Sequence, residues 1–428
     1  MKGKTLEQIA AALSLACSSK KTVLDFAIDS RKIQPGSLFF AMKGVKVDGH
    51  QFLRDVAGRG AVGAVVDQHY AGDDFGLVLL RVPHVLDALH HLAKLVFQKR
   101  KERIVAVTGS VGKTTTKEFI ADLLSVRYRV EKTHGNANSQ VSLPLTLLNL
   151  EGEYDILVLE MGMSLPGEIA KLVEIAPPDV ALVTAIAPAH IGFFPNGLEG
   201  VAAAKAEIFN SPRTKIGFLS AQAAEFPAIL HTRCPKIIYS LSDLPFMQVP
   251  FTASHLLENL TGAIAVACAF DLNWEEIQRG CMRLKPFAMR FETIEREGVI
   301  FINDCYNANP ASMRAALTNL PKPSQGRRTV GVLGTMAHQG HLSHAHHAEI
   351  GELALKCVDE LLCIGAECAP MVEIFKQAGR PVELFSDLEE MKRRLGGLVQ
   401  AGDVVLIKGE NSQKLWQIMD DISCSSSC

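Results

Sequence analysis

The stretch Arg103-Ile-Val-Ala-Val-Thr108-Gly-Ser-Val-Gly-Lys-Thr-Thr-Thr116 decides the fold of this chain. It opens with a mostly apolar run of the kind found in buried parallel strands. A turn with two glycines follows, and the residues after the turn begin a helix. This order gives the Gly-Lys-Thr motif the context of a phosphate-binding loop, although its G-x-x-G-K-T spacing is shorter than the usual G-x-x-x-x-G-K-[ST].

The residues of this loop predict how a nucleotide is held. The two glycines let backbone N–H groups converge on an anion, and the start of the helix adds its dipole. Lys113 can neutralise a phosphate, and a threonine hydroxyl can ligate Mg²⁺. The alternative is a simple glycine turn with an exposed lysine. The predicted ATP-binding residues of the loop are Gly109, Ser110, Gly112, Lys113, Thr114 and Thr115.

On either side of this stretch, apolar strands alternate with helical segments, so we expect an α/β protein with doubly wound, mostly parallel sheets. The alternation predicts three domains: a small α/β domain over 1–83, a central P-loop ATPase-like domain over 84–288 and a Rossmann-like domain over 289–428. The predicted strands of the central and last domains are 103–108, 155–160, 180–184, 299–303, 329–333, 360–364, 382–385 and 404–407.

Composition limits the function classes open to a chain of 428 residues. Lys and Arg total 44 against 46 Asp and Glu, a net charge of −2, so the basic surface that nucleic-acid binding requires is not expected. The ten cysteines form no C-x-x-C pair, which is typical of a reducing compartment. No stretch offers about 18 uninterrupted apolar residues. We therefore expect a cytoplasmic protein without membrane insertion.

Three residues beyond the phosphate loop are candidates for metal chemistry. Glu160 ends the strand over 155–160, and a carboxylate at the carboxyl edge of a parallel sheet lies where ligands bind. His190 follows the strand over 180–184 and is a second candidate ligand of Mg²⁺ or phosphate. Each has a plainer interpretation: a solvated strand-end glutamate and a packed histidine. Lys205, in a helical Ala-Ala-Ala-Lys-Ala-Glu sequence, has by itself the pattern of a surface lysine.

Two further clusters of polar residues have open interpretations. Asp304-Cys-Tyr-Asn-Ala-Asn-Pro310 ends an apolar strand and offers an aromatic ring, amides and a carboxylate suited to a nucleotide base, or else forms an Asn-Pro turn. Five histidines lie between His338 and His347, but their spacing fits no structural zinc pattern. A solvated loop and helix start is the alternative for that cluster.

Taken together, these motifs closely resemble the Mur ligases, and among them the type that joins D-Ala-D-Ala to UDP-N-acetylmuramoyl-tripeptide. The most specific match is Asp304 to Pro310 followed by Ser312-Met313, which resembles the signature D-x-Y-N-A-N-P-x-S-M. Glu160-Met-Gly162 and His255-x-x-x-Asn259 match further family elements, and the run from Asp29 to Gly44 matches the first domain. The resemblance covers nearly the whole chain.

The resemblance implies roles for individual residues. Lys113, Glu160, His190 and Lys205 are the expected catalytic residues; Thr114, Glu160, His190 and Lys205, the last as a carbamate, are the expected ligands of two Mg²⁺ ions. An ammonium cannot ligate Mg²⁺, whereas a carbamate offers anionic oxygens. The remaining ATP-binding residues are expected to be Asn259, Arg290, Asp304, Tyr306 and Asn307, and those near the UDP-linked substrate Ser30, Arg31, Lys43, His50 and Asn138.

The activity implied is ligation in cytoplasmic peptidoglycan precursor synthesis by a monomer. ATP phosphorylates the tripeptide carboxylate, and the amine of D-Ala-D-Ala attacks the acyl phosphate, releasing ADP and phosphate. The alternatives are a Mur-type ligase that adds the third residue, a folylpolyglutamate synthase-like ligase, and a nucleotide-binding module without ligation. The chain departs from the family at Gly334-Thr-Met-Ala-His-Gln-Gly340 and at Lys408-Gly-Glu-Asn411, where no sites are assigned.

Overall fold

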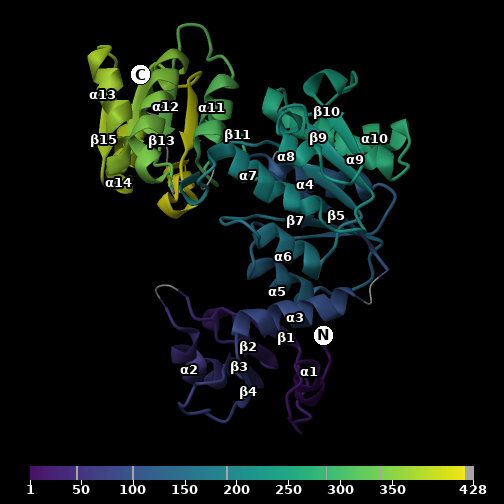
Figure 1. The fold of residues 1–428 in the computed structure, drawn as a ribbon. Helices are drawn as coiled ribbons and strands as arrows, with labels where there is room; N and C mark the ends of the chain where they lie inside the picture. Colours follow the sequence, from purple (N-terminus) through teal and green to yellow (C-terminus); the bar gives the residue numbers. More distant parts are fainter. Residues whose placement is uncertain (45–46, 99–100, 189–190, 286, 338, 420–428) are drawn as a thin grey trace.

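The computed structural model describes residues 1–44, 47–98, 101–188, 191–285, 287–337 and 339–419. The described chain forms three α/β domains, each built on its own sheet, and Figure 1 shows them following one another along the sequence from purple to yellow. The expected fold class, with a central doubly wound sheet and a Rossmann-like third domain, is confirmed.

The first sheet is small and wholly parallel, with strand order β1-β2-β3-β4. Helix α3 (Val85–Phe97) lies between this sheet and the central domain in Figure 1. Its apolar face joins one continuous core with Leu80 of the first domain and Leu147 of the second. The other elements of this domain are α1 (Leu6–Ala12), β1 (Asp25–Ala27), β2 (Ser37–Phe40), α2 (Leu53–Gly58), β3 (Gly63–Asp67) and β4 (Val78–Val82).

The central sheet is also parallel, with strand order β10-β9-β8-β5-β7-β6. Its middle strands are buried along their length because helices cover both faces. The strands are β5 (Arg103–Thr108), β6 (Val130–Lys132), β7 (Ile156–Glu160), β8 (Val180–Val183), β9 (Ile216–Ser220) and β10 (Lys236–Tyr239). The helices are α4 (Lys113–Leu124), α5 (Ser142–Asn149), α6 (Glu168–Ile175), α7 (Gly197–Ala206), α8 (Pro227–Leu230), α9 (Ser254–Ala269) and α10 (Trp274–Cys281).

The third sheet has the order β11-β12-β16-β13-β14-β15 and is parallel except for the β11–β12 pair at one edge. Its strands are β11 (Glu292–Arg296), β12 (Val299–Asn303), β13 (Thr329–Leu333), β14 (Glu360–Ile364), β15 (Val382–Phe385) and β16 (Val404–Lys408). Its helices are α11 (Pro310–Thr318), α12 (Ser343–Cys357), α13 (Ala369–Gln377) and α14 (Leu388–Gly396).

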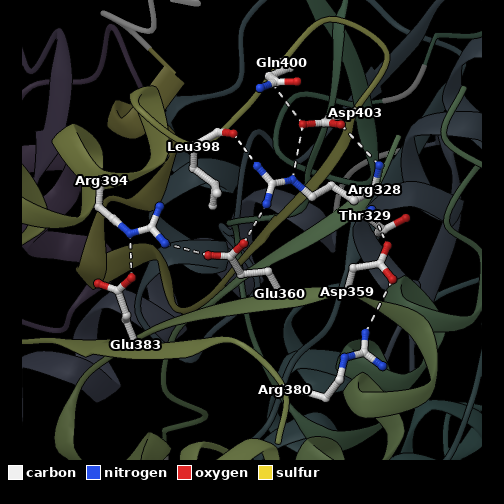
Figure 2. A network of polar contacts seen from close by, with 10 residues as sticks. All are labelled: Arg328, Thr329, Asp359, Glu360, Arg380, Glu383, Arg394, Leu398, Gln400 and Asp403. Carbon is white, nitrogen blue, oxygen red and sulfur yellow. Dashed lines mark hydrogen bonds and ion pairs between the residues drawn. The ribbon is translucent and has the colours of Figure 1, made fainter. Parts of the chain in front are cut away.

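A network of ion pairs closes the amino end of the third sheet (Figure 2). The carboxylate of Glu360, at the start of β14, accepts from Arg328 at 2.9 Å and from Arg394 at 2.7 Å. Arg328 Nε also lies 3.7 Å from Asp403 Oδ2, and Asp403 Oδ1 accepts the backbone N–H of Arg328. The carboxylates of Glu360 and Asp403 are almost fully buried, so the network ties strand starts to the loops beside them.

Candidate active site

The phosphate loop is held tightly by its neighbours. Gly109 has φ +149° and Gly112 has φ +84°, backbone conformations that favour glycine. A side chain at Gly109 would meet the hydroxyl of Thr184, and one at Gly112 would meet the amide oxygen of Asn259. The Thr184 hydroxyl in turn donates to the Val111 carbonyl at 2.5 Å. The loop therefore sits against β8 and α9 with no room for a side chain at either glycine.

Two lysines converge on one carbonyl of this loop. Lys113 and Lys205 each donate from Nζ to the Gly109 carbonyl oxygen at 2.8 Å. Lys205 is only 3% exposed, so its interpretation as a surface lysine is wrong. Burial lowers the pKa of both ammonium groups, and the charge of Lys113 lowers the pKa of Lys205 further. Two neighbouring ammonium groups disfavour each other's charge, and an anion placed beside them would favour it.

Glu160 lies opposite these lysines and is 2% exposed, which excludes a solvated strand-end glutamate. Its Oε2 accepts from the Thr114 hydroxyl at 2.8 Å, and its Oε1 accepts from the Asn138 amide at 2.7 Å. A hydroxyl and a carboxylate side by side are oxygen donors of the type that Mg²⁺ prefers.

The described residues contain no group of three or more His, Cys, Asp and Glu side chains arranged to hold a metal. An ion beside Glu160 would therefore need the Thr114 hydroxyl and oxygens of a bound phosphate as further ligands. His190, the other predicted ligand, lies outside the described residues.

Arg290 joins the third domain to the phosphate loop. Its Nη2 donates to the Thr114 hydroxyl at 3.0 Å, and its guanidinium carbon lies 3.8 Å from the centroid of the Tyr306 ring. Burial lowers the pKa of Arg290, and its Nε is a buried atom without a hydrogen-bond partner among the described residues. A buried donor of this kind marks a place where an anionic ligand would be favoured.

The loop after β12 both forms a turn at Asn309-Pro310 and offers polar side chains to the cavity, the two alternatives that its sequence suggested. Asn309 caps α11, since its side-chain oxygen accepts the Ser312 N–H at 2.9 Å, with Pro310 in the first turn. Asp304 and Asn309 both line the cavity, and Asp304 Oδ1 accepts the Phe291 N–H at 3.1 Å. The helix cap and the candidate site therefore belong to one loop.

Lys408, at the end of β16, was not singled out from sequence. Its side chain is 1% exposed and donates to Asp304 Oδ2 at 2.6 Å and to the Asn307 carbonyl at 3.0 Å. The apolar run of β16 predicted the strand, but only the paired register of β12 and β16 brings Lys408 to Asp304.

His255 was quoted only as part of a motif and also faces the cavity. Burial lowers its pKa to about 4, and its Nδ1 is a buried atom without a hydrogen-bond partner among the described residues. Its ring meets that of Phe291 edge to face, with 4.8 Å between centroids. A neutral imidazole with an unused nitrogen can exchange a hydrogen bond with a ligand.

These residues enclose a cavity of about 740 Å³ between the central and third domains. This volume is in the range of small-molecule sites. Gly109 and Lys205 are not among the residues that line it. The predicted site residues that line the cavity are Ser110, Gly112, Lys113, Thr114, Thr115, Asn138, Glu160, Asn259, Arg290, Asp304, Tyr306 and Asn307.

The four residues predicted to hold the UDP end lie in the first domain, outside this cavity. Ser30 and Arg31 belong to one short 3-10 helix, and the exposed Arg31 pairs with Asp29 at 2.8 Å. Lys43 is exposed. His50 is engaged within its own domain: Nδ1 lies 2.6 Å from Asp48, and Nε2 accepts the Asp67 N–H at 3.0 Å.

The histidines from 339 to 347 do not form a zinc site in the part of the chain that is described. His347 is fully buried, where its Nε2 accepts the Met336 N–H at 3.1 Å, so the interpretation of a wholly solvated segment is also wrong. His346 pairs with Gln339 at 2.7 Å. His338 lies outside the described residues.

Comparison with known proteins agrees with this geometry. Three family models match: "Mur ligase family, catalytic domain" over 26–96, "Mur ligase middle domain" over 107–245 and "Mur ligase, glutamate ligase domain" over 289–411. A protein of Bacillus subtilis named UDP-N-acetylmuramoyl-tripeptide--D-alanyl-D-alanine ligase is 31% identical, with 92% of each chain covered. The chain belongs to the Mur ligase family.

Solved structures extend the likeness to this Mur ligase in three dimensions. A crystal structure of MurF from Acinetobacter baumannii matches with a TM-score of 0.82 at 27% identity, covering 98% of both chains. MurF ligase from Thermotoga maritima in complex with ADP matches with a TM-score of 0.76 at 26% identity, covering 92% of this chain and 96% of that one. No described helix is long and apolar enough to span a membrane.

Proposed function

We propose that this Mur ligase uses ATP to join D-Ala-D-Ala to UDP-N-acetylmuramoyl-tripeptide, forming ADP and phosphate in cytoplasmic peptidoglycan precursor synthesis. The substrates are inferred from the name of the full-length relative. The observation that carries the chemistry is the single cavity in which the phosphate loop of the central domain faces Arg290 and Asp304 of the third. The ADP complex of a related structure supports the choice of nucleotide.

The reaction needs a phosphoryl group because a free carboxylate is not electrophilic. A carboxylate oxygen of the tripeptide attacks the γ-phosphorus of ATP, the bond between that phosphorus and the β,γ-bridging oxygen breaks, and ADP leaves. The D-Ala-D-Ala amine then attacks the carbonyl carbon, and phosphate leaves as the amine loses its proton. Phosphoryl transfer between two anions requires neutralised charge and aligned reactants.

The phosphate loop and Arg290 supply that charge. The backbone of Gly109, Ser110 and Gly112, with Thr115, holds the phosphates of ATP. Lys113 leaves the Gly109 carbonyl to meet the β- and γ-phosphates, and Arg290 meets the γ-phosphate with its Nε, which has no partner among the described residues. The ammonium and guanidinium offset the charge that repels the incoming carboxylate.

The base and ribose of ATP lie toward the third domain. Asn259 borders the phosphate loop at Gly112, and Tyr306 and Asn307 of the third domain line the cavity. Asp304 fixes the start of the loop after β12, because it accepts hydrogen bonds from the Phe291 N–H and from Lys408. These side chains offer stacking and hydrogen bonds to the nucleoside.

The residues present fit Mg²⁺, since Thr114 and Glu160 place two oxygen donors together. Thr114 and Glu160 would hold one ion, and His190 with the carbamate of Lys205 a second. Mg²⁺ supplies charge neutralisation to the phosphate oxygens when bound. The lowered pKa of Lys205 supports the carbamate, because only a neutral amine adds to CO₂.

The first domain binds the UDP end of the larger substrate through Ser30, Arg31, Lys43 and His50. Asn138, in the central domain, contacts the tripeptide near Glu160. The three domains extend over 1–83, 84–288 and 289–428. The enzyme acts as a cytoplasmic monomer.

Phosphate release tests this function. The purified chain is mixed with ATP, Mg²⁺, UDP-N-acetylmuramoyl-tripeptide and D-Ala-D-Ala, and each substrate is left out in turn. We expect sustained release only when both the tripeptide and D-Ala-D-Ala are present, and ¹⁸O from a labelled tripeptide carboxylate to appear in the phosphate. Release that needs neither substrate, or that needs glutamate and a folate, would contradict the proposal.

A further inference from the structure

Lys117 is a charged residue that the reaction described above does not use. It lies on α4, one turn after Thr114, and its side chain is fully buried. Its Nζ donates to the Thr133 carbonyl at 2.5 Å and to the Gly135 carbonyl at 3.4 Å, and lies 3.0 Å from Glu118. A buried ammonium is costly unless its donors are satisfied, and here three oxygens surround it.

Glu118 alone does not explain this lysine. The second oxygen of the Glu118 carboxylate lies 2.5 Å from Lys132, which is partly exposed. Glu118 therefore keeps a cationic partner when Lys117 is replaced by an uncharged residue. The two carbonyls of Thr133 and Gly135 lie close to the ammonium in a buried place, so their interaction is what distinguishes Lys117 from Lys132.

The segment that Lys117 holds leads directly to the candidate metal ligands. The hydroxyl of Thr133 accepts the backbone N–H of Glu160 at 3.1 Å. Further along, the carbonyl of Asn138 accepts the Gly162 N–H at 2.8 Å, while its side chain donates to Glu160. The segment 133–138 therefore holds Glu160 through both its backbone and its carboxylate.

We propose that Lys117 is a positioning residue for ligation: it fastens segment 133–138 to α4, so that Asn138 and Glu160 meet Thr114 on the same helix. Lys117 itself does not line the cavity. The chain of contacts runs from Lys117 through the Thr133 carbonyl to Glu160 and back to α4 at Thr114. This inference rests on the proposed function only for the claim that Glu160 serves catalysis.

The test compares Lys117→Met with Lys132→Met. Both changes remove a cation from Glu118, but only the first releases segment 133–138. We measure thermal unfolding, kcat, and the Kd of ADP with and without Mg²⁺. For Lys117→Met we expect kcat to fall about 10- to 100-fold, since small misplacements at a reacting centre have effects of this order. The Kd of ADP without Mg²⁺ should stay within about twofold of the wild-type value. The factor by which Mg²⁺ tightens ADP binding should shrink at least about fivefold.

Lys132→Met should match the wild type within about twofold in kcat and in the Kd of ADP with and without Mg²⁺. A folded Lys117→Met protein with unchanged kcat and an unchanged Mg²⁺ gain would overturn the proposal, as would equal losses of ADP binding with and without Mg²⁺. If Lys117→Met does not fold, Thr133→Val is compared with Thr133→Ser, which keeps the hydroxyl. A loss of kcat and of the Mg²⁺ effect on ADP binding in Thr133→Val but not in Thr133→Ser supports the link to Glu160. Equal values in the two variants overturn it.

These readings separate the two proposals. If the wild-type chain releases no phosphate with the muramoyl substrate and D-Ala-D-Ala, the proposed function fails. The Mg²⁺ dependence of ADP binding then still reports whether Lys117 positions Glu160.

Discussion

The two ends of the third sheet carry charged residues of opposite character. At the amino end, Glu360 accepts from both Arg328 and Arg394, and Figure 2 shows its carboxylate between the two guanidinium groups. At the carboxyl end, Asp304 and Lys408 pair at 2.6 Å beside a cavity. Arg290 lies next to Phe291, whose N–H donates to Asp304, and keeps a buried donor without a partner among the described residues.

The difference separates stability from function. Where the buried charges satisfy one another, as around Glu360, their loss should cost folding free energy and leave the reaction unchanged. Where buried polar atoms have no partner among the described residues, as at Arg290 and His255, a ligand can supply the partner, and changes there should act on the reaction. Ligands of parallel sheets bind at the carboxyl ends of the strands, which agrees with this division.

The largest effect is expected at the phosphate loop. Lys113→Met removes the cation that meets the β- and γ-phosphates, and we expect phosphate release to fall by about 10³-fold or more. The melting temperature should not fall, because burial already lowers the pKa of this ammonium. Exposed Lys322→Met is the control and should keep its activity. Retained activity in Lys113→Met would contradict a role of Lys113 in binding the phosphates of ATP.

Lys205→Ala should reduce kcat by about 10²-fold or more. A short carboxylate such as acetate, added at high concentration, should restore part of this activity by replacing the carbamate oxygens. Both kcat values are measured from ligated product. Full activity in the untreated variant would refute a role for the carbamate.

Glu360→Gln tests the amino end of the sheet. Removing one partner from a buried ion-pair network should lower the free energy of unfolding by about 3 kcal/mol, measured by urea denaturation. Arg380→Met, which breaks an exposed pair with Asp359 at 3.4 Å, should cost less than about 1 kcal/mol. Both variants should keep kcat within about twofold. A loss of kcat without a loss of stability in Glu360→Gln would reverse the comparison.

A smaller effect is expected from His255. Its folded pKa of about 4 lies below the ordinary 6.5, so the stability it contributes is present above pH 6.5 and is lost as the pH falls toward 4. Between pH 7 and pH 5 this amounts to about 2 kcal/mol. His255→Gln should lack this part of the acid destabilisation, as urea denaturation at both pH values would reveal. An identical pH dependence in both proteins would show that His255 is not held neutral.

Strands with mostly apolar sequences were the most predictable part of the fold. The strands 103–108, 299–303, 329–333, 360–364 and 382–385 were predicted with the boundaries that the structure shows. Helices on both faces of a parallel sheet require continuous apolar runs, which are visible in sequence. The edge strands β6 and β11 were missed, because they carry polar residues such as those of Glu292–Arg296. The more apolar β9 and β10 were missed as well.

Site residues were predictable only where a motif carried them. The phosphate loop has a local pattern, and a carboxylate at a strand end has a position. Lys205 has neither, because its burial depends on α7 bringing its ammonium to the Gly109 carbonyl, 96 residues away in sequence. Lys408 and Lys117 were missed for the same reason: each contacts carbonyls of a distant loop, and no spacing along the chain encodes that contact.

The central claim is that this chain ligates D-Ala-D-Ala as a unit, and the mass of the product tests it most directly. The enzyme is given ATP, Mg²⁺ and UDP-N-acetylmuramoyl-tripeptide together with equal amounts of D-Ala-D-Ala, D-Ala and D-Ala-D-lactate. We predict one dominant product, heavier than the tripeptide by D-Ala-D-Ala less one water. A product carrying a single added amino acid, or no ligated product while ATP is hydrolysed, would contradict the account.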